Sequence, residues 1–261
     1  MYDAQSICAM NPAALLPTPE AKAAHVRRMF GDIAHRYDFL NHLLSLNRDR
    51  AWRRRAVDVL LQGDLLSGVQ AVVLDACAGT LDLSVELARR PAYQGRVLGF
   101  DFAYPMLAAG LTKVGSLAIA PACADALHLP VPDASCSGAM VAFGVRNLAD
   151  LEGGLRELAR VLRPGGRLVI LEFMTPQWQP FRGLYLGYFR RVLPLIGRAV
   201  SRHGSAYSYL PASVLEFPEP RRLAVMLETA GFGDVSWQAM TGGIVALHTG
   251  ERLGRVAPLV T

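Results

Sequence analysis

The sequence predicts an α/β fold in which a parallel sheet carries helices on both faces. Short apolar runs alternate with segments of helical pattern over most of the chain, and such an alternation is typical of a parallel sheet covered by helices. The clearest example is residues 70–101. There an apolar run ends in Asp75, a turn of small residues and a helix follow, and a second apolar run ends in Asp101. At 261 residues the chain can bury a substantial core in one large domain.

The elements before the sheet are predicted from composition and periodicity. Residues 1–21 are rich in Ala and Pro, so we expect a poorly ordered tail. Residues 22–62 have a helical pattern that is interrupted near Asn47. The sheet is therefore expected to begin only after residue 62.

The sheet itself follows from apolar runs of strand length. We expect strands at 71–75, 96–101, 118–122, 138–143 and 167–173, and two closing strands at 235–239 and 244–249. We expect helices at 82–90, 104–114, 150–162 and 219–230. Arg163, Pro164, Gly165 and Gly166 indicate a helix stop and a tight turn, and Gly231 stops the last helix.

Residues 175–217 interrupt the alternation. Aromatic, Leu and Arg residues are interleaved there, and Pro180, Pro194 and Pro211 divide the expected helices. We therefore expect a helical insertion within a single domain of residues 22–250, followed by a C-terminal tail at 251–261.

Composition excludes several classes of function. The cysteines and histidines show no zinc-binding spacing, so no metal is expected. The basic run at 48–55 lacks interleaved aromatic residues and is typical of a solvated helix face, so no nucleic-acid partner is expected. No run is long enough to span a bilayer and the N-terminus lacks a basic signal region, which indicates a cytoplasmic protein.

The unit at 70–101 predicts a nucleoside ligand. Ligands bind at the carboxyl ends of the strands in an open parallel sheet, where Asp101 could accept both hydroxyls of a ribose. Gly79 stands alone where a dinucleotide loop would have three glycines, and Asp75, Asp82 and Asp101 would repel phosphate. S-adenosyl-L-methionine fits this pattern. Another nucleotide-binding protein and a purely structural strand–helix–strand unit are the alternatives.

Three further sets of segments resemble one protein family. They are MFGDIAHRYDFLNHLLSLNRDRAWRRRAV (29–57), AFGVRN (142–147) with RVLRPGGRLVILEF (160–173), and SYLPASVLEFP (208–218) with GGIVALHTG (242–250). Together with the nucleoside unit they resemble the ubiquinone/menaquinone biosynthesis C-methyltransferases over about 29–250. The resemblance implies a class I S-adenosylmethionine-dependent methyltransferase (Rossmann-like) fold. It also implies methyl transfer to the ring of a reduced polyprenyl quinone, either demethylmenaquinol or the ubiquinone precursor.

The resemblance also implies which residues bind the cofactor. It assigns Gly79, Thr80, Asp125 and Ala126 as contacts, beside Asp101 on the ribose. Two further residues are candidates for this site: Asp75, which would orient the turn amides or the methionyl amine, and Ala142, where the family often has a small hydroxyl residue. For Asp75 the alternative is an acid that caps N–H groups at the strand end.

On the acceptor side, Tyr37, Asp38 and Asn41 are expected on a helix that forms a lid over the cofactor and the quinol. The alternative is that Tyr37 packs and Asp38 caps. Arg146 is expected to stabilise a phenolate or polarise a water, with Asn147 orienting the loop. The alternative for Arg146 is a salt bridge, with Glu172 as its partner.

The polyprenyl tail is expected to contact residues 178–200. Tyr185, Tyr188 and Phe189 approach helical spacing there and would form part of a wall, with arginines near lipid headgroups. The alternative is a plain core-facing helix with solvated arginines. Peripheral contact with the inner face of the cell membrane and a homodimer are further expectations.

One departure from the family bears on activity. The family usually has Gly-Thr-Gly-Asp in the cofactor turn, whereas Leu81 occupies the third position here. Glycine permits close ligand approach and unusual backbone angles. Two alternatives to quinol methylation follow: a methyltransferase of this fold with another aromatic or polyketide acceptor, and a non-catalytic relative whose cofactor site has decayed at Leu81.

Overall fold

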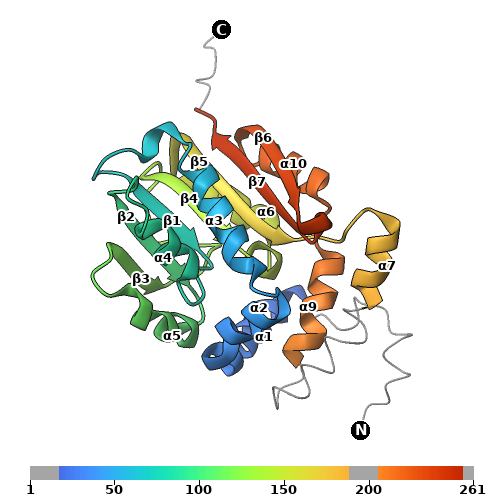
Figure 1. Cartoon of the computed structure of the whole chain (residues 1–261). Coiled ribbons are helices and arrows are strands. Elements are labelled where there is room, and N and C mark those ends of the chain that lie inside the picture. The colour runs from blue at the N-terminus through green and yellow to red at the C-terminus, as the bar shows by residue number, and fades with distance from the viewer. Residues whose placement is uncertain (1–17, 188–204, 255–261) are drawn as a thin grey trace.

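The computed structural model describes residues 18–187 and 205–254 and contains one seven-stranded sheet in the order β3-β2-β1-β4-β5-β7-β6 (Figure 1). The strands are β1 Val72–Ala76, β2 Arg96–Asp101, β3 Ile119–Cys123, β4 Cys136–Ala142, β5 Leu162–Phe173, β6 Phe232–Met240 and β7 Val245–Arg252. The helices are α1 Pro19–Ile33, α2 Tyr37–Leu44, α3 Arg48–Leu60, α4 Asp82–Ala88, α5 Tyr104–Val114, α6 Leu151–Val161, α7 Gln179–Gly187, α9 Ser205–Glu216 and α10 Pro220–Thr229.

The sheet is mixed, which corrects the expectation of a wholly parallel one. Strands β1 to β5 pair in parallel, whereas β7 is antiparallel to both β5 and β6. The connection between β6 and β7 is the short segment 241–244. A connection of that length joins antiparallel neighbours, because a parallel pair needs a crossover of a dozen or more residues.

Two hydrophobic cores lie on opposite faces of the sheet, because alternate residues of each strand point to opposite sides. On one face Val73 packs with Trp52 and Leu60 of α3 and with α4. On the other face Leu74 packs with Leu158 of α6 and with α10. The expected helices on both faces are therefore confirmed.

The region around residue 164 differs from the expected turn. Residues 162–166 belong to β5, and the register against β4 shifts from Cys136↔Leu162 to Gly138↔Arg167. Gly165 adopts φ +77° inside this irregularity. The Pro-Gly-Gly sequence thus produces a bulge within a long strand, because the chain resumes pairing with the same neighbour.

Helices α1 and α2 lie against the carboxyl ends of the strands, whereas α3 covers a face of the sheet (Figure 1). Helix α1 begins at Pro19, before the expected start at residue 22. The expected break at Asn47 is confirmed, because this residue has a left-handed φ of 60° between α2 and α3. Helix α1 packs against α9 through Val26, Met29 and Tyr209.

The expected insertion after β5 contains α7 and α9 (Figure 1). Tyr188 and Phe189 lie outside the described residues. Within 18–187 and 205–254, no helix combines the length and the apolar character that a membrane crossing requires.

Candidate functional site

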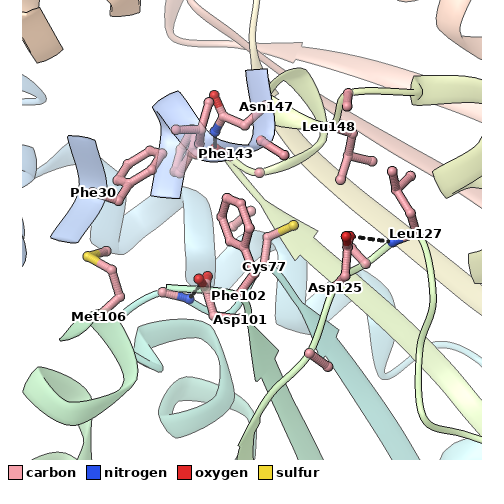
Figure 2. Close-up of a pocket in the computed structure, with 18 of the residues that line it drawn as sticks. Phe30, Cys77, Asp101, Phe102, Met106, Asp125, Leu127, Phe143, Asn147 and Leu148 are labelled. Atoms are coloured by element: carbon pink, nitrogen blue, oxygen red, sulfur yellow. Dashed lines mark hydrogen bonds between the residues drawn. The ribbon is translucent and has the colours of Figure 1, made fainter. Parts of the chain in front are cut away.

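A cavity with about 700 Å³ of empty space, part of it open to solvent, lies where the carboxyl ends of β1, β2 and β4 meet α1 and α2 (Figure 2). Its mostly apolar lining with a few polar groups is typical of a site for a small organic ligand. Many of the residues expected at the cofactor and acceptor sites line it, namely Tyr37, Gly79, Asp101, Asp125, Ala126, Ala142 and Asn147.

Asp101 is the central polar group of the cavity. One carboxylate oxygen accepts a hydrogen bond from Gly79 N at 2.8 Å, and the other accepts from Ala103 N at 2.8 Å. Burial raises the pKa of Asp101, and these hydrogen bonds oppose that rise. Gly79 has φ +54°, a conformation in which glycine carries no steric penalty. The strand tip and the turn are therefore held together at the edge of the cavity.

The electrostatics of the cavity exclude phosphate. Among its described lining residues the only charged side chains are Asp101 and Asp125, and no Lys or Arg is present. Asp125 accepts a hydrogen bond from Leu127 N at 2.9 Å. Burial and nearby acids raise the pKa of the Cys77 thiol well above its usual value, so this lining residue is neutral at pH 7. An uncharged or cationic nucleoside fits this lining.

Leu81 does not line the cavity. Its φ is 65°, and its side chain is fully buried against Ala78 and Leu107. Space for it exists because residue 99 is glycine: a Cβ at Gly99 would lie 2.7 Å from Leu81 Cδ2. The departure from the family pattern is thus accommodated on the side of the turn that faces the interior.

Asp75, which was expected to orient the turn amides or the methionyl amine, is not among the residues that line the cavity. Its carboxylate accepts a hydrogen bond from the Ser84 hydroxyl on α4, and it is 1% exposed. Burial raises its pKa to about 7. Ser84 also donates its backbone N–H to this carboxylate, which agrees with the alternative of an acid that caps N–H groups at the strand end.

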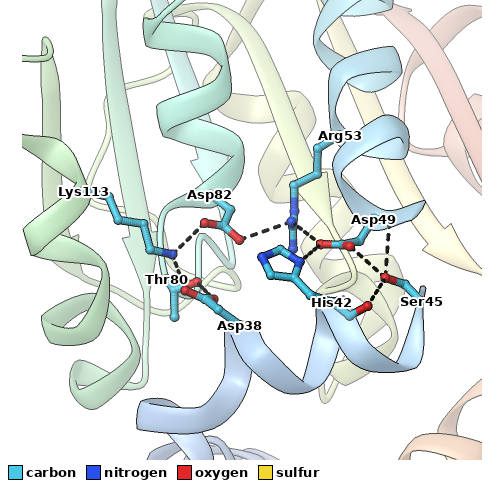
Figure 3. A network of polar contacts seen from close by, with 8 residues as sticks. All are labelled: Asp38, His42, Ser45, Asp49, Arg53, Thr80, Asp82 and Lys113. Carbon is cyan, nitrogen blue, oxygen red and sulfur yellow. Dashed lines mark hydrogen bonds and ion pairs between the residues drawn. The ribbon is translucent and has the colours of Figure 1, made fainter. Parts of the chain in front are cut away.

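Thr80 and Asp38 face each other instead of the cavity. The Thr80 hydroxyl donates to Asp38 Oδ1 at 2.6 Å, and Asp38 also forms an ion pair with Lys113 (Figure 3). Lys113 pairs in turn with Asp82 at 2.6 Å. Asp38 therefore links α2 to the turn after β1 and to α5.

The same network extends into α3 (Figure 3). Arg53 pairs with Asp82 at 3.2 Å and with Asp49 at 2.6 Å, and Asp49 contacts His42 of α2 at 2.8 Å. Arg53 is buried, so the basic run 48–55 is not solvated throughout. The expected solvated face is confirmed for Arg48, Arg50, Arg54 and Arg55, which are exposed.

Tyr37 lines the cavity from α2, as the lid interpretation requires. Its ring makes an edge contact with Phe30 of α1, with centroids 5.8 Å apart. Burial raises the pKa of Tyr37, against the effect of a hydrogen bond with Asn41. A neutral phenol therefore lines the cavity at pH 7.

Arg146 forms the ion pair that was the alternative to a catalytic role. Its Nη1 donates to Glu172 Oε1 at 2.7 Å and to the Phe143 carbonyl, and the guanidinium lies over the Phe173 ring at 5.4 Å. Both charged side chains are buried. Arg146 thus holds the loop after β4. The carboxylate of Glu172 largely balances its charge.

Asn147 follows in the 3₁₀-helix η5 (Val145–Asn147) and does line the cavity. Its Nδ2 donates to the Phe143 carbonyl at 3.3 Å. Its Oδ1 is buried without a hydrogen-bond partner among the described residues. Tyr185 is buried on α7 but is not among the residues that line the cavity.

Sequence reasoning missed two kinds of site residue. The first is the apolar wall from α1 and α5, which includes Val26, Phe30 and Met106. The second is the pair of lysines: Lys113 in the network, and Lys22, which donates to the carbonyls of Arg146 and Leu148. These are the only two lysines in the chain. Their scarcity was the one feature of the sequence that could have indicated a specific role for each. Within the described ranges, no group of three His, Cys, Asp or Glu side chains could hold a metal ion.

Comparison with known proteins defines the class. The [4+2]-cyclase SpnF matches with a TM-score of 0.58 at 17% identity, covering 77% of this chain and 81% of that one. A Haemonchus contortus phosphoethanolamine N-methyltransferase 2, solved with S-adenosyl-L-methionine, matches with a TM-score of 0.56 at 13% identity, covering 77% and 52%. The fold is that of the Rossmann-like class I methyltransferases.

The particular family follows from sequence. The model of the ubiE/COQ5 methyltransferase family matches residues 18–252. A demethylmenaquinone methyltransferase of Thermus thermophilus is 46% identical over 86% of this chain and all of its own length. The ubiquinone/menaquinone biosynthesis C-methyltransferase UbiE of Geobacter sulfurreducens is 43% identical over 88% of this chain and 90% of its own. The chain belongs to the ubiE/COQ5 methyltransferase family.

The contact between Leu81 and Gly99 generates a test of how the turn tolerates leucine. We predict that Gly99→Ala lowers the free energy of unfolding by about 1–3 kcal/mol, because its Cβ overlaps the leucine. In a Leu81→Gly background the same substitution should have little effect. Urea unfolding of the two single variants and the double variant measures this coupling.

Gly31→Ala is the matched control, because its Cβ would meet only Pro105 at an ordinary 3.7 Å. Its effect should add to that of Leu81→Gly. Additive effects for Gly99→Ala as well would show that the two positions do not share space.

Proposed function

We propose that the protein transfers a methyl group from S-adenosyl-L-methionine to a ring carbon of a reduced polyprenyl quinone, converting demethylmenaquinol to menaquinol. The observation that carries this is a cavity whose described lining has acids but no Lys or Arg, with Asp101 among them, in a chain of this family. Its relatives named for demethylmenaquinone reach 46% identity over nearly their full length. The ubiquinone precursor is the second acceptor to consider.

The cavity residues fit the cofactor. Asp101 would accept the ribose hydroxyls, Gly79 would permit close backbone approach, and Asp125 with Ala126 would face the adenine. Ala142 adds a small apolar contact at the end of β4. When bound, S-adenosyl-L-methionine supplies a sulfonium methyl group that is open to attack by an electron-rich carbon.

The acceptor side works by exclusion of water and by positioning. A cationic donor and a phenolate acceptor give neutral products, so a water-poor wall favours the reaction once both are held there. Val26, Phe30 and Tyr37 provide such a wall. We assign Arg146 a positioning role through its ion pair with Glu172, with Asn147 presenting its amide to the acceptor.

The test is methyl transfer from labelled S-adenosyl-L-methionine to chemically reduced demethylmenaquinol and to the corresponding ubiquinone precursor. We expect labelled product with demethylmenaquinol. Product only with a soluble aromatic or polyketide acceptor would contradict the proposal, and so would cofactor binding without any transfer to either quinol.

We also propose that the protein works at the inner face of the cell membrane, where a polyprenyl quinol resides. The outward face of α2 and the turn after it expose Phe39 by 60%, Leu43 by 43% and Leu46 by 82%. Tyr37 and Asn41 lie on the opposite side of this helix, because 100° separates successive residues. Exposed arginines follow on α3, namely Arg48, Arg50 and Arg54. Apolar side chains beside arginines suit an anionic lipid surface.

Flotation with vesicles tests this contact. We predict that the protein floats with phosphatidylglycerol vesicles, less so in high salt, and that combined Phe39→Ser, Leu43→Ser and Leu46→Ser substitutions abolish flotation. A variant with Val69→Ser and Val225→Ser is the control, because both valines are exposed away from α2. Equal flotation of the two variants would contradict a role for this face.

A further inference from the structure

Lys22 reaches from α1 to the loop that follows β4. Its ammonium group donates hydrogen bonds to the carbonyl of Arg146 at 3.0 Å and to the carbonyl of Leu148 at 2.7 Å. These partners lie 124 and 126 positions away in the sequence. Hydrogen bonds with a charged donor are stronger than those between neutral groups. One side chain therefore joins the first turn of α1 to the backbone on both sides of Asn147.

Stability alone does not account for a lysine at this position. Burial lowers the pKa of Lys22 and the nearby Arg146 guanidinium lowers it further, because both disfavour the charged form. The lysine also lies in the first turn of α1, where the helix dipole disfavours a positive charge. A cation that is held against both effects indicates that its two hydrogen bonds serve a purpose beyond folding.

The two segments that Lys22 joins both line the cavity. One face of α1 and the loop after β4 contribute Ala23, Val26, Phe30, Asn147, Leu148 and Ala149. Figure 2 shows Asn147 and Leu148 on one side of the cavity and Asp101 on the other. Asp101 is held by hydrogen bonds of its own from the backbone N–H groups of the turn and the strand end. The wall that Lys22 joins is therefore separate from the acid that is proposed to bind the ribose.

We propose that Lys22 is a positioning residue for the aromatic acceptor. It fixes the loop after β4 against α1, so that Asn147 and the apolar face of α1 form one wall of fixed shape. This rests on the proposed function. Lys22 is not among the residues that line the cavity and acts through the loop. Without its donors the carbonyls of Arg146 and Leu148 lose this partner, the loop separates from α1, and the acceptor meets a less ordered wall.

Lys22→Met tests this role, because methionine retains an unbranched side chain and lacks the donors. Calorimetry measures the binding of 1,4-naphthohydroquinone, under anaerobic conditions, to protein saturated with S-adenosylhomocysteine. We expect Lys22→Met to weaken this binding by about tenfold, and Lys22→Arg to restore most of it because it keeps a charged donor. Affinity for S-adenosylhomocysteine should change little, because the hydrogen bonds of Asp101 are intact. Amide hydrogen exchange at Asn147 and Leu148 should be faster in Lys22→Met.

Arg252→Met is the matched control. Arg252 also donates to backbone carbonyls from a distant part of the chain, namely those of Ala159 at 2.8 Å and Gly231 at 3.0 Å. It ends β7, which runs antiparallel to β5, so it lies at the edge of the sheet opposite the cavity. Arg252→Met should lower Tm and leave the binding of the hydroquinone unchanged.

The same pattern in Lys22→Met, a lower Tm with unchanged affinity for the hydroquinone, would overturn the inference. Failure of the unaltered protein to bind the hydroquinone would overturn it as well. In the methyl-transfer assay, Lys22→Met should raise KM for demethylmenaquinol more than it lowers kcat. Binding of the hydroquinone that depends on Lys22, without methyl transfer to either quinol, would contradict the proposed function and support the role of Lys22.

Discussion

The carboxylate of Asp101 is the interaction on which the site depends. It accepts hydrogen bonds from Gly79 in the turn after β1 and from Ala103 just beyond β2. These two bonds fix the tip of β2 and the cofactor turn as one unit at the carboxyl edge of the sheet. A charge-assisted hydrogen bond is about twice as strong as a neutral one, which suits a buried acid that must keep its orientation.

A second set of charged side chains attaches α2 to this unit. Thr80, next to Gly79 in the turn, bonds Asp38 of α2, and Lys113 of α5 bridges Asp38 and Asp82. Individual pairs of partly exposed charges contribute little. Their combined effect is geometric, because three helices and the turn share one set of side chains (Figure 3). The wall that Tyr37 presents to the cavity therefore has a fixed position relative to the cofactor turn.

The sequence predicted the local secondary structure better than it predicted which strands and side chains interact. The bounds of β2 and α5 match at both ends, because periodicity and turn residues lie within each segment. Asp101 and Gly79 could be placed because the strand–turn–helix pattern itself brings them to the ligand edge. The antiparallel β7 was not foreseen, since an apolar run alone carries no direction.

Side-chain partners far apart in the chain could not be read in the same way. Thr80 and Asp38 are separated by 42 positions, and Lys113 and Asp38 by 75. No local pattern joins them, so Asp38 was expected at the ligand and was found in the network. Arg146 shows the same limit: both of its expected roles were compatible with the sequence, and the ion pair with Glu172 is visible only in the structure. Leu81 is tolerated for a reason located at Gly99.

We propose that the cavity around Asp101 binds the cofactor despite Leu81. The test is calorimetric titration with S-adenosylhomocysteine, with Asp101→Asn beside the unaltered protein and Asp64→Asn as an exposed-acid control. We expect saturable binding by the unaltered protein and the control, and binding weaker by about tenfold or more for Asp101→Asn. No binding by the unaltered protein, or equal binding by Asp101→Asn, would contradict it.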